Sequence, residues 1–568
     1  MKQKLIIYQT FPRIMTNANP TCVPGGTLEQ NGSGKFNDIT AKVIKSIADM
    51  GVNCIWLTGV VEMATKTAFE GIPADNPNVV KGEAGSPYAI KDYYDVAPSL
   101  SENLAERMNE FMSLVKRIHS QGLKVIIDFV PNHTARVYHS DCASSGISDF
   151  GSNDDISKFF SPSNNYYYIV NQQFSPDFPL DTEGDKPYVE FPAKATGNDC
   201  FTAFCHKNDW YETVKLNYGY DPGDHTRHFE PVPDTWLRML AILRYWAAKG
   251  VDGFRCDMVF MVPQEFWHWV IPEVHKDYPS VIFIGEIYDI NLYRSFLDYC
   301  HFDYLYDKVN LYDTLVGIEK HNVSAAQLTN CWQRIDGIGD SMLNFLENHD
   351  EVRFASEEYA ADPSKVIPSL VVSAMLGKGP FMIYYGQELG EMAKDNEGFA
   401  GNNNRSTIFD YWSYDTLRRW YNDGKCNIQK LTPQEKWLRK MYKTVLTLCN
   451  TCTPVREGKF FDLMYVNLKN PDFNPHRQFA FLRYTEDEAV LIIANFDNKD
   501  VNVSLHVPQL AIDMAGLSEG KQAAMDMLWN KEHVFEIGSD KETRLQIGGH
   551  DALILPLMKK SVAKENLG

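Results

Sequence analysis

The chain has 568 residues, of which 44% are hydrophobic and 23% charged, values typical of globular proteins and not of disordered or fibrous chains. Its 74 acidic and 55 basic residues give a net charge of −19, which would repel nucleic-acid phosphates and anionic lipid surfaces. We therefore expect neither nucleic acid nor a membrane as a partner. The aromatic content of 13% favours stacking on an uncharged sugar instead.

The eleven cysteines are scattered and lack the spacing of a disulfide framework, so most are expected to be small buried residues. Cys449 and Cys452 form one CxxC pair in a predicted helix with no second pair, which argues against zinc. The first apolar run is too short for a signal peptide, and we expect a cytoplasmic protein unless a signal has been removed. Residues 366–386 are interrupted by Lys378 and Pro380, which predicts a buried helix, a turn and a strand and not a membrane span.

Short β-branched or aromatic runs alternate with amphipathic stretches over most of the chain, which is the pattern of parallel βα units. Two helices have clear ends, since residues 104–121 precede Gly122 and residues 234–249 precede Gly250. Eight strands with intervening helices predict an α/β fold, the (β/α)8 TIM barrel. The eight runs are residues 4–11, 53–60, 124–130, 251–257, 281–287, 302–308, 341–350 and 381–386.

The predicted strands are unevenly spaced at one place, between the third and the fourth. The intervening residues are too many for one helix and its loops, and 132–223 are rich in Asn, Ser, Asp, Gly, Pro and Tyr. We predict an inserted domain there, with residues 1–131 and 224–453 forming the catalytic barrel. Alternating apolar runs after that point predict a C-terminal β-sandwich domain over residues 454–568.

Polar and charged residues follow four of the predicted strands, at the C-terminal face where the function of such a barrel gathers. Alternation along the fourth strand places Arg255 and Asp257 on one face, and Cys256 on the other, where it is expected to be packed and unreactive. The residues at these strand ends are Asp128, Asn132 and His133 in "DFVPNH", Arg255 and Asp257 in "GFRCD", Glu286 in "GEIY", and His349 and Asp350 in "ENHDE".

This set of side chains suits hydrolysis of a glycosidic bond with retention of configuration. The reaction needs a carboxylate nucleophile and a protonated carboxyl on opposite sides of the bond, roughly 5–5.5 Å apart. A neighbouring Arg keeps one carboxylate ionised, whereas burial raises the proton affinity of another. Asp257, two residues from Arg255, fits the first role, and Glu286, with no basic neighbour in the sequence, fits the second.

The four segments resemble the signature regions of the α-amylase family, glycoside hydrolase family 13, in the family's order and over about residues 4–453. The resemblance implies a retaining glycoside hydrolase that cleaves α-1,4-glucosidic bonds in α-glucans or maltooligosaccharides through a covalent glycosyl-Asp intermediate. It implies three catalytic residues. Asp257 would be the nucleophile, Glu286 the general acid and then base, and Asp350 the third carboxylate, which grips sugar hydroxyls.

The resemblance also implies a set of substrate-binding residues. Tyr88 would stack beneath the reacting sugar, His133 and His349 would bond sugar hydroxyls, and Arg255 would orient Asp257. Asp92 and Asp128 are expected to be structural, and Asn217 in "LNYG" to fasten the inserted domain or the substrate loop. Trp210 and Tyr211 form either a stacking platform or part of the core of the inserted domain.

The sequence departs from the family pattern after the nucleophile. Many family members have Lys and then His there, and the His gives a backbone carbonyl to calcium, whereas this chain has Phe260 and Met261. We therefore expect different product-side subsites. The chemistry requires no cofactor, and a structural calcium ion is the one candidate, with Asn132 and residues 152–155 ("SNDD") as possible oxygen ligands. A solvated acidic loop is the alternative.

Other functions also fit these residues. A glucanotransferase or an exo-acting α-glucosidase would use the same intermediate, because water and a sugar hydroxyl compete for it. A non-catalytic sugar-binding protein is less favoured, since all three carboxylates and Arg255 are present. The sequence does not give linkage preference, chain-length preference or oligomeric state.

Overall fold

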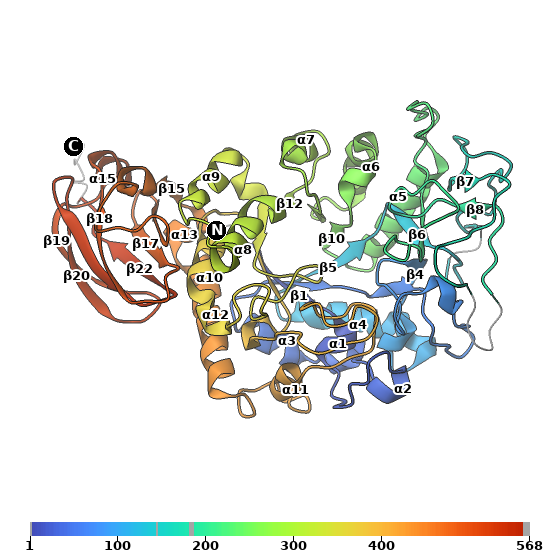
Figure 1. Cartoon of the computed structure of the whole chain (residues 1–568), viewed down its shortest axis with the longest axis horizontal. Helices are drawn as coiled ribbons and strands as arrows, with labels where there is room; N and C mark the ends of the chain where they lie inside the picture. Colours follow the sequence, from blue (N-terminus) through green and yellow to red (C-terminus); the bar gives the residue numbers. More distant parts are fainter. Residues whose placement is uncertain (1–2, 144–145, 181–186, 561–568) are drawn as a thin grey trace.

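The eight predicted strands close into one parallel barrel in the computed structural model, which describes residues 3–143, 146–180 and 187–560 (Figure 1). Following the chain, each strand pairs with the next, and β14 closes the barrel against β1. The strands are buried almost throughout, because a parallel barrel is covered on both faces. They are β1 (Ile6–Thr10), β2 (Cys54–Leu57), β5 (Lys124–Phe129), β10 (Gly253–Cys256), β11 (Ile282–Gly285), β12 (Tyr304–Tyr306), β13 (Met342–Phe345) and β14 (Phe381–Tyr384).

The predicted (β/α)8 barrel is thus confirmed, but its strands are shorter than the predicted runs. The difference is largest in the seventh run, where β13 ends at Phe345 and the rest of the motif forms a loop. Asn348 shapes that loop, because its side-chain oxygen accepts hydrogen bonds from the backbone N–H groups of Asp350 and Glu351 at 2.8 and 3.0 Å. The polar residues of this motif therefore lie beyond the strand and not within it.

Helices surround the barrel, and the two predicted from glycine stops are confirmed. Helix α4 (Arg107–Ser120) and helix α5 (Asp234–Ala248) end just before Gly122 and Gly250, which have φ values of +77° and +93°. Glycine adopts this left-handed conformation without a side-chain clash, so it ends a helix readily. Further helices are α3 (Ala41–Ala48), α6 (Gln264–Asp277), α7 (Tyr293–Asp298), α8 (Asp313–Lys320), α9 (Gln327–Arg334), α11 (Asp415–Tyr421) and α12 (Pro433–Thr451).

The apolar stretch 366–386 forms helix α10 (Val366–Met375), a turn and strand β14, as predicted. Every residue of α10 is buried, because the helix packs against β13 and also against strands of the C-terminal region. Among the described residues, none of the helices combines the length and the apolar character needed to cross a bilayer.

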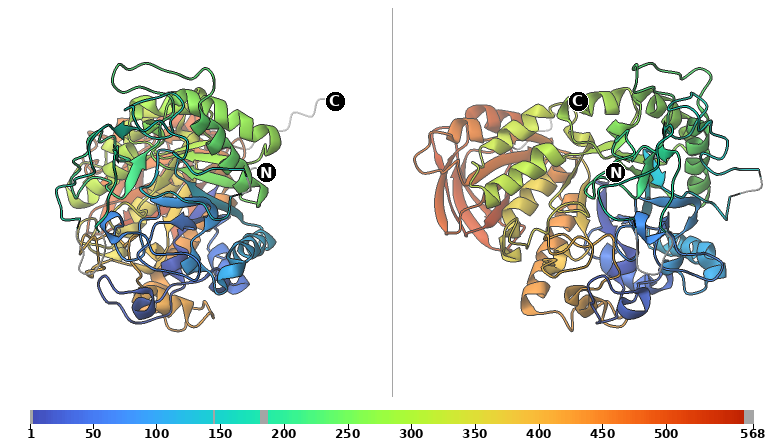
Figure 2. Two further views of the ribbon diagram at one scale, coloured as in Figure 1. Left: turned by 90° about the vertical axis from the view of Figure 1, so that its right-hand side faces the viewer. Right: turned by 45° about the vertical axis from the view of Figure 1, so that its right-hand side comes forward.

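The chain between β5 and α5 forms the predicted insert, which contains two antiparallel strand pairs. Strand β6 (His133–Ala135) pairs with β9 (Thr213–Lys215), and β7 (Tyr168–Ile169) pairs with β8 (Ala193–Lys194). The insert has a hydrophobic cluster of its own, and the cluster includes Phe174, Tyr188 and Tyr211. Figures 1 and 2 show it at the end of the molecule opposite the C-terminal strands.

After α12 and the short helix α13 (Thr453–Glu457) the structure is mainly antiparallel β, as predicted. One sheet has the order β15-β16-β17-β22, and two further pairs are β18-β21 and β19-β20. The predicted domain boundaries stay predictions. The strands are β15 (Lys459–Asp462), β16 (Gln478–Tyr484), β17 (Ala489–Asn495), β18 (Val501–His506), β19 (Gly520–Met525), β20 (Glu532–Ile537), β21 (Glu542–Ile547) and β22 (Asp551–Leu557).

All eleven cysteines lie in the described part of the chain, and all are unpaired. Cys256 is fully buried, as alternation along its strand predicts. Cys449 and Cys452 are buried at the end of α12, and the Cys449 thiol donates to the Ala374 carbonyl at 3.6 Å. Neither belongs to a group of described side chains with metal-ligand spacing.

Arg483 on β16 allows a test of how the C-terminal sheet is fastened to the barrel. It is buried and donates hydrogen bonds to four backbone carbonyls, one of them at the end of α10. We expect Arg483→Leu to lower the free energy of unfolding by about 3 kcal/mol, because these buried hydrogen bonds are lost. The acceptors are Leu376 (3.2 Å), Pro454 (3.3 Å), Val455 (3.2 Å) and Gly458 (2.8 Å).

Urea denaturation of the two proteins measures this difference. Arg544 on β21 is the matched control, since its side chain is 78% exposed and its substitution by Leu should change stability by less than about 0.5 kcal/mol. Equal losses in the two variants would show that Arg483 does not fasten the sheet.

Candidate active site

The register of the barrel strands places the predicted site residues next to one another. Strands β5 and β10 pair so that Asp128 lies beside Arg255. Asp257 and Glu286 directly follow β10 and β11, and their N–H groups donate to carbonyls of the neighbouring strands at 2.9 and 3.0 Å. Three adjacent strands thus present three carboxylates and the Arg255 guanidinium at the same end of the barrel. The carboxylates are those of Asp128, Asp257 and Glu286.

Arg255 is fully buried at the centre of this group. Its Nη1 lies 2.8 Å from Asp257 Oδ1 and 3.5 Å from Asp128 Oδ1, and its Nη2 lies 2.6 Å from Glu286 Oε1. Its Nε donates to the Tyr306 hydroxyl at 3.1 Å. Burial favours loss of its proton, but the surrounding carboxylates, Glu286 foremost, hold the pKa of Arg255 well above its usual value.

These contacts correct one expectation from the sequence. Asp257 was expected to have the basic neighbour and Glu286 to lack one, but Arg255 contacts both carboxylates, at 2.8 and 2.6 Å. Burial raises the pKa of Asp257 well above its usual value, the charge of Glu286 raises it further, and Arg255 opposes both effects. The two carboxylates therefore share one buried guanidinium as their counter-ion.

Glu286 has two further donors, which the sequence reasoning missed. The Tyr288 hydroxyl donates to Oε1 at 2.6 Å, and the Met258 backbone N–H donates to Oε2 at 2.9 Å. Met258 has a φ of +45°, an uncommon value for a residue with a side chain, and its N–H points at the carboxylate. Tyr288 belongs to the motif "GEIY", two residues after Glu286, so alternation could have identified it; nothing in the sequence marks the Met258 backbone.

His349 connects the Tyr88 ring and Asp350 to the first strand of the barrel. Its Nε2 contacts the Tyr88 hydroxyl and lies 3.1 Å from Asp350 Oδ2, and its Nδ1 lies 2.8 Å from Gln9 Nε2. The Tyr88 and His349 rings stack at 5.3 Å with 25° between their planes. The sequence reasoning did not identify Gln9 as a site residue. Its position as a polar residue inside the apolar strand β1 could have indicated a role at the site. Burial opposes ionisation of Asp350, but His349 lowers the pKa of this carboxyl to about 2.

His133 lies on β6, where the insert leaves the barrel. Its Nδ1 lies 3.1 Å from Asn132 Nδ2, and its ring centroid lies 5.3 Å from that of Trp210. Burial, together with the nearby Lys215 ammonium, lowers the pKa of His133 to about 3. The ring is therefore neutral near pH 7.

A cavity of about 280 Å³ brings these residues together. Five of the seven predicted catalytic and substrate-binding residues line it, and Arg255 and His349 lie buried behind them. Trp210 lines the cavity, where a stacking platform would lie. Tyr211 instead belongs to the core of the insert. The lining residues that were predicted are Tyr88, His133, Asp257, Glu286 and Asp350.

A larger cavity of about 610 Å³ lies where the sequence departs from the family pattern. Phe260 and Met261 line it, together with Tyr220 and Phe229 of the segment that leads to α5. The Phe260 ring contacts the ring of Tyr288, which lines the smaller cavity, at a centroid distance of 6.3 Å. The two cavities therefore adjoin through these two aromatic side chains.

Asn132 is fully buried, and its side chain is already occupied by protein groups. Its Oδ1 accepts from Lys215 Nζ at 2.5 Å, and its Nδ2 donates to the Gly197 carbonyl at 2.8 Å. An ammonium nitrogen thus lies where a cation bound to this oxygen would lie, so the arrangement does not fit a calcium ion. In residues 152–155, Asp154 accepts the backbone N–H groups of Asn165 and Tyr166 and belongs to the internal bonding of the insert.

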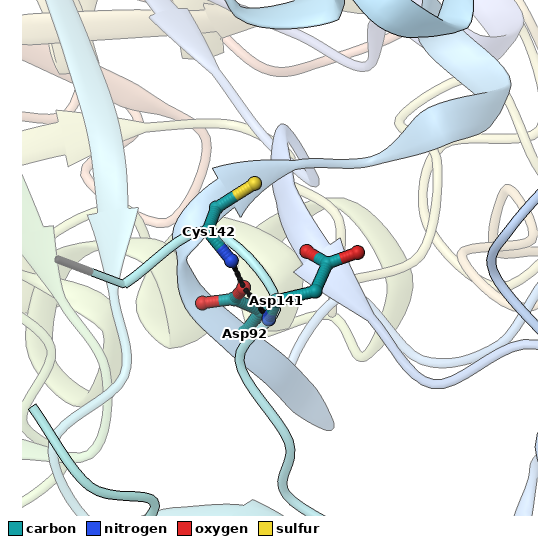
Figure 3. A group of neighbouring side chains, drawn as sticks. All are labelled: Asp92, Asp141 and Cys142. Atoms are coloured by element: carbon teal, nitrogen blue, oxygen red, sulfur yellow. Dashed lines mark hydrogen bonds between the residues drawn. The ribbon is translucent and has the colours of Figure 1, made fainter. Parts of the chain in front are cut away.

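Two groups of described side chains do have metal-ligand spacing, at the junction of the insert with β4 (Ile90–Val96). They are Asp92, Asp141 and Cys142, and Glu62, Asp95 and Asp141. Figure 3 shows that Asp92 accepts the N–H groups of Asp141 and Cys142, at 3.2 and 3.4 Å. The Arg107 guanidinium contacts Asp95 and Asp141 and is their counter-ion. Asp92 therefore ties the insert to β4.

Asn217 fastens the insert internally. Its Nδ2 donates to the Ser161 carbonyl at 2.9 Å, and its Oδ1 accepts the N–H of Gly219 at 2.8 Å. Asp128 accepts from the Trp56 indole at 3.1 Å and from the Tyr88 hydroxyl at 3.3 Å, so it lies in the hydrogen-bond network beneath the cavity.

Comparison with known proteins decides the family of the chain. Residues 9–445 match the model of the α-amylase catalytic domain. The chain belongs to the α-amylase family. Its α-amylase-type barrel is 23% identical over 429 residues to a cyclomaltodextrin glucanotransferase of Bacillus licheniformis, covering 71% of this chain and 52% of that one. The chain therefore spans about half the length of this relative.

Two further comparisons cover more of the chain. An α-glucosidase of Apis mellifera is 24% identical over 579 residues, covering 89% of this chain and 87% of that one. The crystal structure of a maltogenic α-amylase from Thermotoga neapolitana superimposes with a TM-score of 0.62 at 19% identity, covering 98% of this chain and 99% of that one. The structural likeness shows that the whole fold is shared, including the C-terminal strands.

The lowered pKa of His133 predicts a pH dependence of stability. The His133 ring takes up a proton only near pH 3 in the folded protein, whereas it does so near pH 6.5 in the unfolded chain. The contribution of the neutral His133 ring to the free energy of unfolding is therefore fully present above about pH 6.5. It is lost as the pH falls toward the pKa of the folded state, by up to about 1.4 kcal/mol per pH unit.

We expect His133→Gln, which has no titrating ring, to lose less stability than the wild type between pH 6.5 and pH 4. Urea denaturation of both proteins at several pH values measures the difference in slope. Parallel curves for the two proteins would show that His133 titrates alike in the folded and unfolded states.

Proposed function

We propose that this protein is a retaining glycoside hydrolase that cleaves α-1,4-glucosidic bonds in α-glucans or maltooligosaccharides. The observation that carries the proposal is the shared buried guanidinium, which holds Asp257 and Glu286 together at one wall of a cavity. Asp350 lines the same cavity, so three carboxylates converge on the space that a sugar ring would fill. The family membership agrees with this chemistry.

In the first step, a carboxylate oxygen of Asp257 attacks the anomeric carbon, and the bond from that carbon to the leaving oxygen breaks. The proton of the Glu286 carboxyl moves to the leaving oxygen, which departs as a sugar hydroxyl. In the second step, Glu286 removes a proton from water, the water oxygen attacks the anomeric carbon, and the Asp257 carboxylate is released. Two displacements at the same carbon retain its configuration.

Burial and the neighbouring charge of Glu286 raise the pKa of Asp257 well above its usual value, whereas the Arg255 guanidinium lowers it and so favours the ionised nucleophile. The mechanism needs one proton at the leaving oxygen, and the proposal assigns that proton to Glu286. Tyr288, which donates to Glu286, lines the same cavity, and the proposal places the leaving oxygen on this side of the sugar.

The remaining site residues bind the sugar. Asp350 stays ionised because His349 lowers its pKa to about 2, so it accepts hydrogen bonds from sugar hydroxyls over the working pH range. Tyr88 lines the cavity with its ring held by His349 and offers an apolar surface to the sugar. His133 is neutral and contributes no charge to the site.

A second candidate is transfer of the glycosyl group to another sugar. The larger cavity adjoins the smaller one on the side of Phe260, where a sugar acceptor could lie and exclude water. The named relatives include a glucanotransferase and an α-glucosidase. Incubation with maltotriose separates the candidates, since products longer than maltotriose indicate transfer and release of glucose alone indicates exo-cleavage.

We expect Asp257→Asn to reduce turnover of a maltooligosaccharide by about 10³-fold or more, because the amide cannot form the glycosyl ester. Affinity for maltotriose, measured by calorimetry, should remain. Asp277→Asn at the exposed end of α6 is the matched control and should keep wild-type turnover.

Proton NMR of the first product formed gives an independent measurement. A retaining enzyme releases the α-anomer before mutarotation. Release of the β-anomer, or full activity of Asp257→Asn, would contradict the proposed mechanism.

A further inference from the structure

Lys215 at the end of β9 extends from the insert toward the barrel and is surrounded by oxygen atoms. Its side chain is 9% exposed. Its Nζ lies 2.5 Å from Asn132 Oδ1, 2.6 Å from Asp199 Oδ1 and 3.0 Å from the Met261 carbonyl oxygen. Amide, carboxylate and backbone carbonyl oxygens are the ligand types that calcium takes in proteins.

The three oxygens belong to segments far apart in the sequence. Asn132 follows barrel strand β5, Asp199 belongs to the insert, and Met261 ends the short helix η5 (Val259–Met261) after the proposed nucleophile. Lys215 therefore joins the insert to the segment that carries Asp257 and Met258. The contact with the Met261 carbonyl is a hydrogen bond from β9 to that segment.

We propose that the Lys215 ammonium occupies a cation site formed by Asn132, Asp199 and Met261, and that this contact between the insert and the barrel is therefore made without calcium. An ammonium has three N–H donors, which match the three acceptors. Its single charge is balanced by the one carboxylate of Asp199. A divalent ion here would face the ammonium at short range and repel it.

The same arrangement makes Lys215 a positioning residue for the active site. It contacts none of the three proposed catalytic carboxylates directly, but its partner Met261 lies in the segment in which the Met258 N–H donates to Glu286. Loss of the ammonium releases this segment from the insert. The effect on chemistry is therefore indirect, and the cation site itself is independent of the substrate proposed above.

The first test uses the wild-type protein. Elemental analysis of the purified protein should find no stoichiometric calcium, and its apparent Tm should be unchanged by dialysis against EDTA and by millimolar calcium. One calcium per chain, with a fall in apparent Tm when it is removed, would overturn the proposal. Because this measurement needs no activity, its failure is distinguishable from failure of the proposed function.

The second test removes the ammonium. Lys215→Met retains most of the aliphatic stem, and we expect it to lower the apparent Tm by about 5 °C or more and to reduce turnover, because Asn132 and Asp199 lose their buried partner. Lys194→Met is the matched control. Lys194 is also a partly buried lysine of the insert, but its Nζ donates to the Arg136 carbonyl within the insert, at 2.7 Å.

The control should be destabilised with kcat close to that of the wild type, whereas Lys215→Met should lose both stability and kcat. Wild-type apparent Tm and kcat in Lys215→Met would overturn the proposal. Equal loss of kcat in the two variants would also overturn it, because the effect would then be general destabilisation of the insert.

A third variant tests whether the oxygens form a cation site at all. Lys215→Ala removes the ammonium and opens the space between Asn132, Asp199 and Met261. Millimolar calcium should raise the apparent Tm of this variant but not of the wild type. An equal rise in both proteins, or no rise in the variant, would overturn the proposal.

Discussion

The active site depends on one interaction, the buried guanidinium of Arg255 shared between Asp257 and Glu286. A buried charge is stable only when opposite charges and hydrogen-bond partners surround it, and each of these three side chains would be costly to bury without the others. The parallel register of β5, β10 and β11 brings the three together. The pairing of β10 with β11 therefore assembles the carboxylate pair.

A second buried cation lies at the other end of the segment that follows β10. Arg255 contacts the segment at Asp257, and Lys215 contacts it at the Met261 carbonyl. Between these points Met258 adopts a left-handed conformation and gives its N–H to Glu286. The backbone strain at Met258 is thus maintained by fixed contacts on both sides. The insert contributes one of these contacts, which couples its packing to the geometry of the carboxylates.

Aromatic and polar side chains behind the cavity complete the arrangement. Trp56, Tyr88 and Tyr306 each place a ring within 5.5 Å of the Arg255 guanidinium carbon. His349 links the Tyr88 ring to Asp350, so a ring that would support a sugar and a carboxylate that would bind its hydroxyls are held by one imidazole. The small cavity is consequently formed by side chains that already have internal partners.

The sequence by itself determined the barrel, the place of the insert, the C-terminal β region and the strand-end residues, because hydrophobic periodicity and ordered motifs are local properties of a chain. Only the tertiary structure decided which charges meet. The sequence separation between Arg255 and Glu286 hides a contact of 2.6 Å, and nothing near Lys215 in the sequence indicates Asn132 and Met261 as partners. Pairings between strands and across the insert set these contacts, and with them the local balance of burial and charge that fixes each pKa.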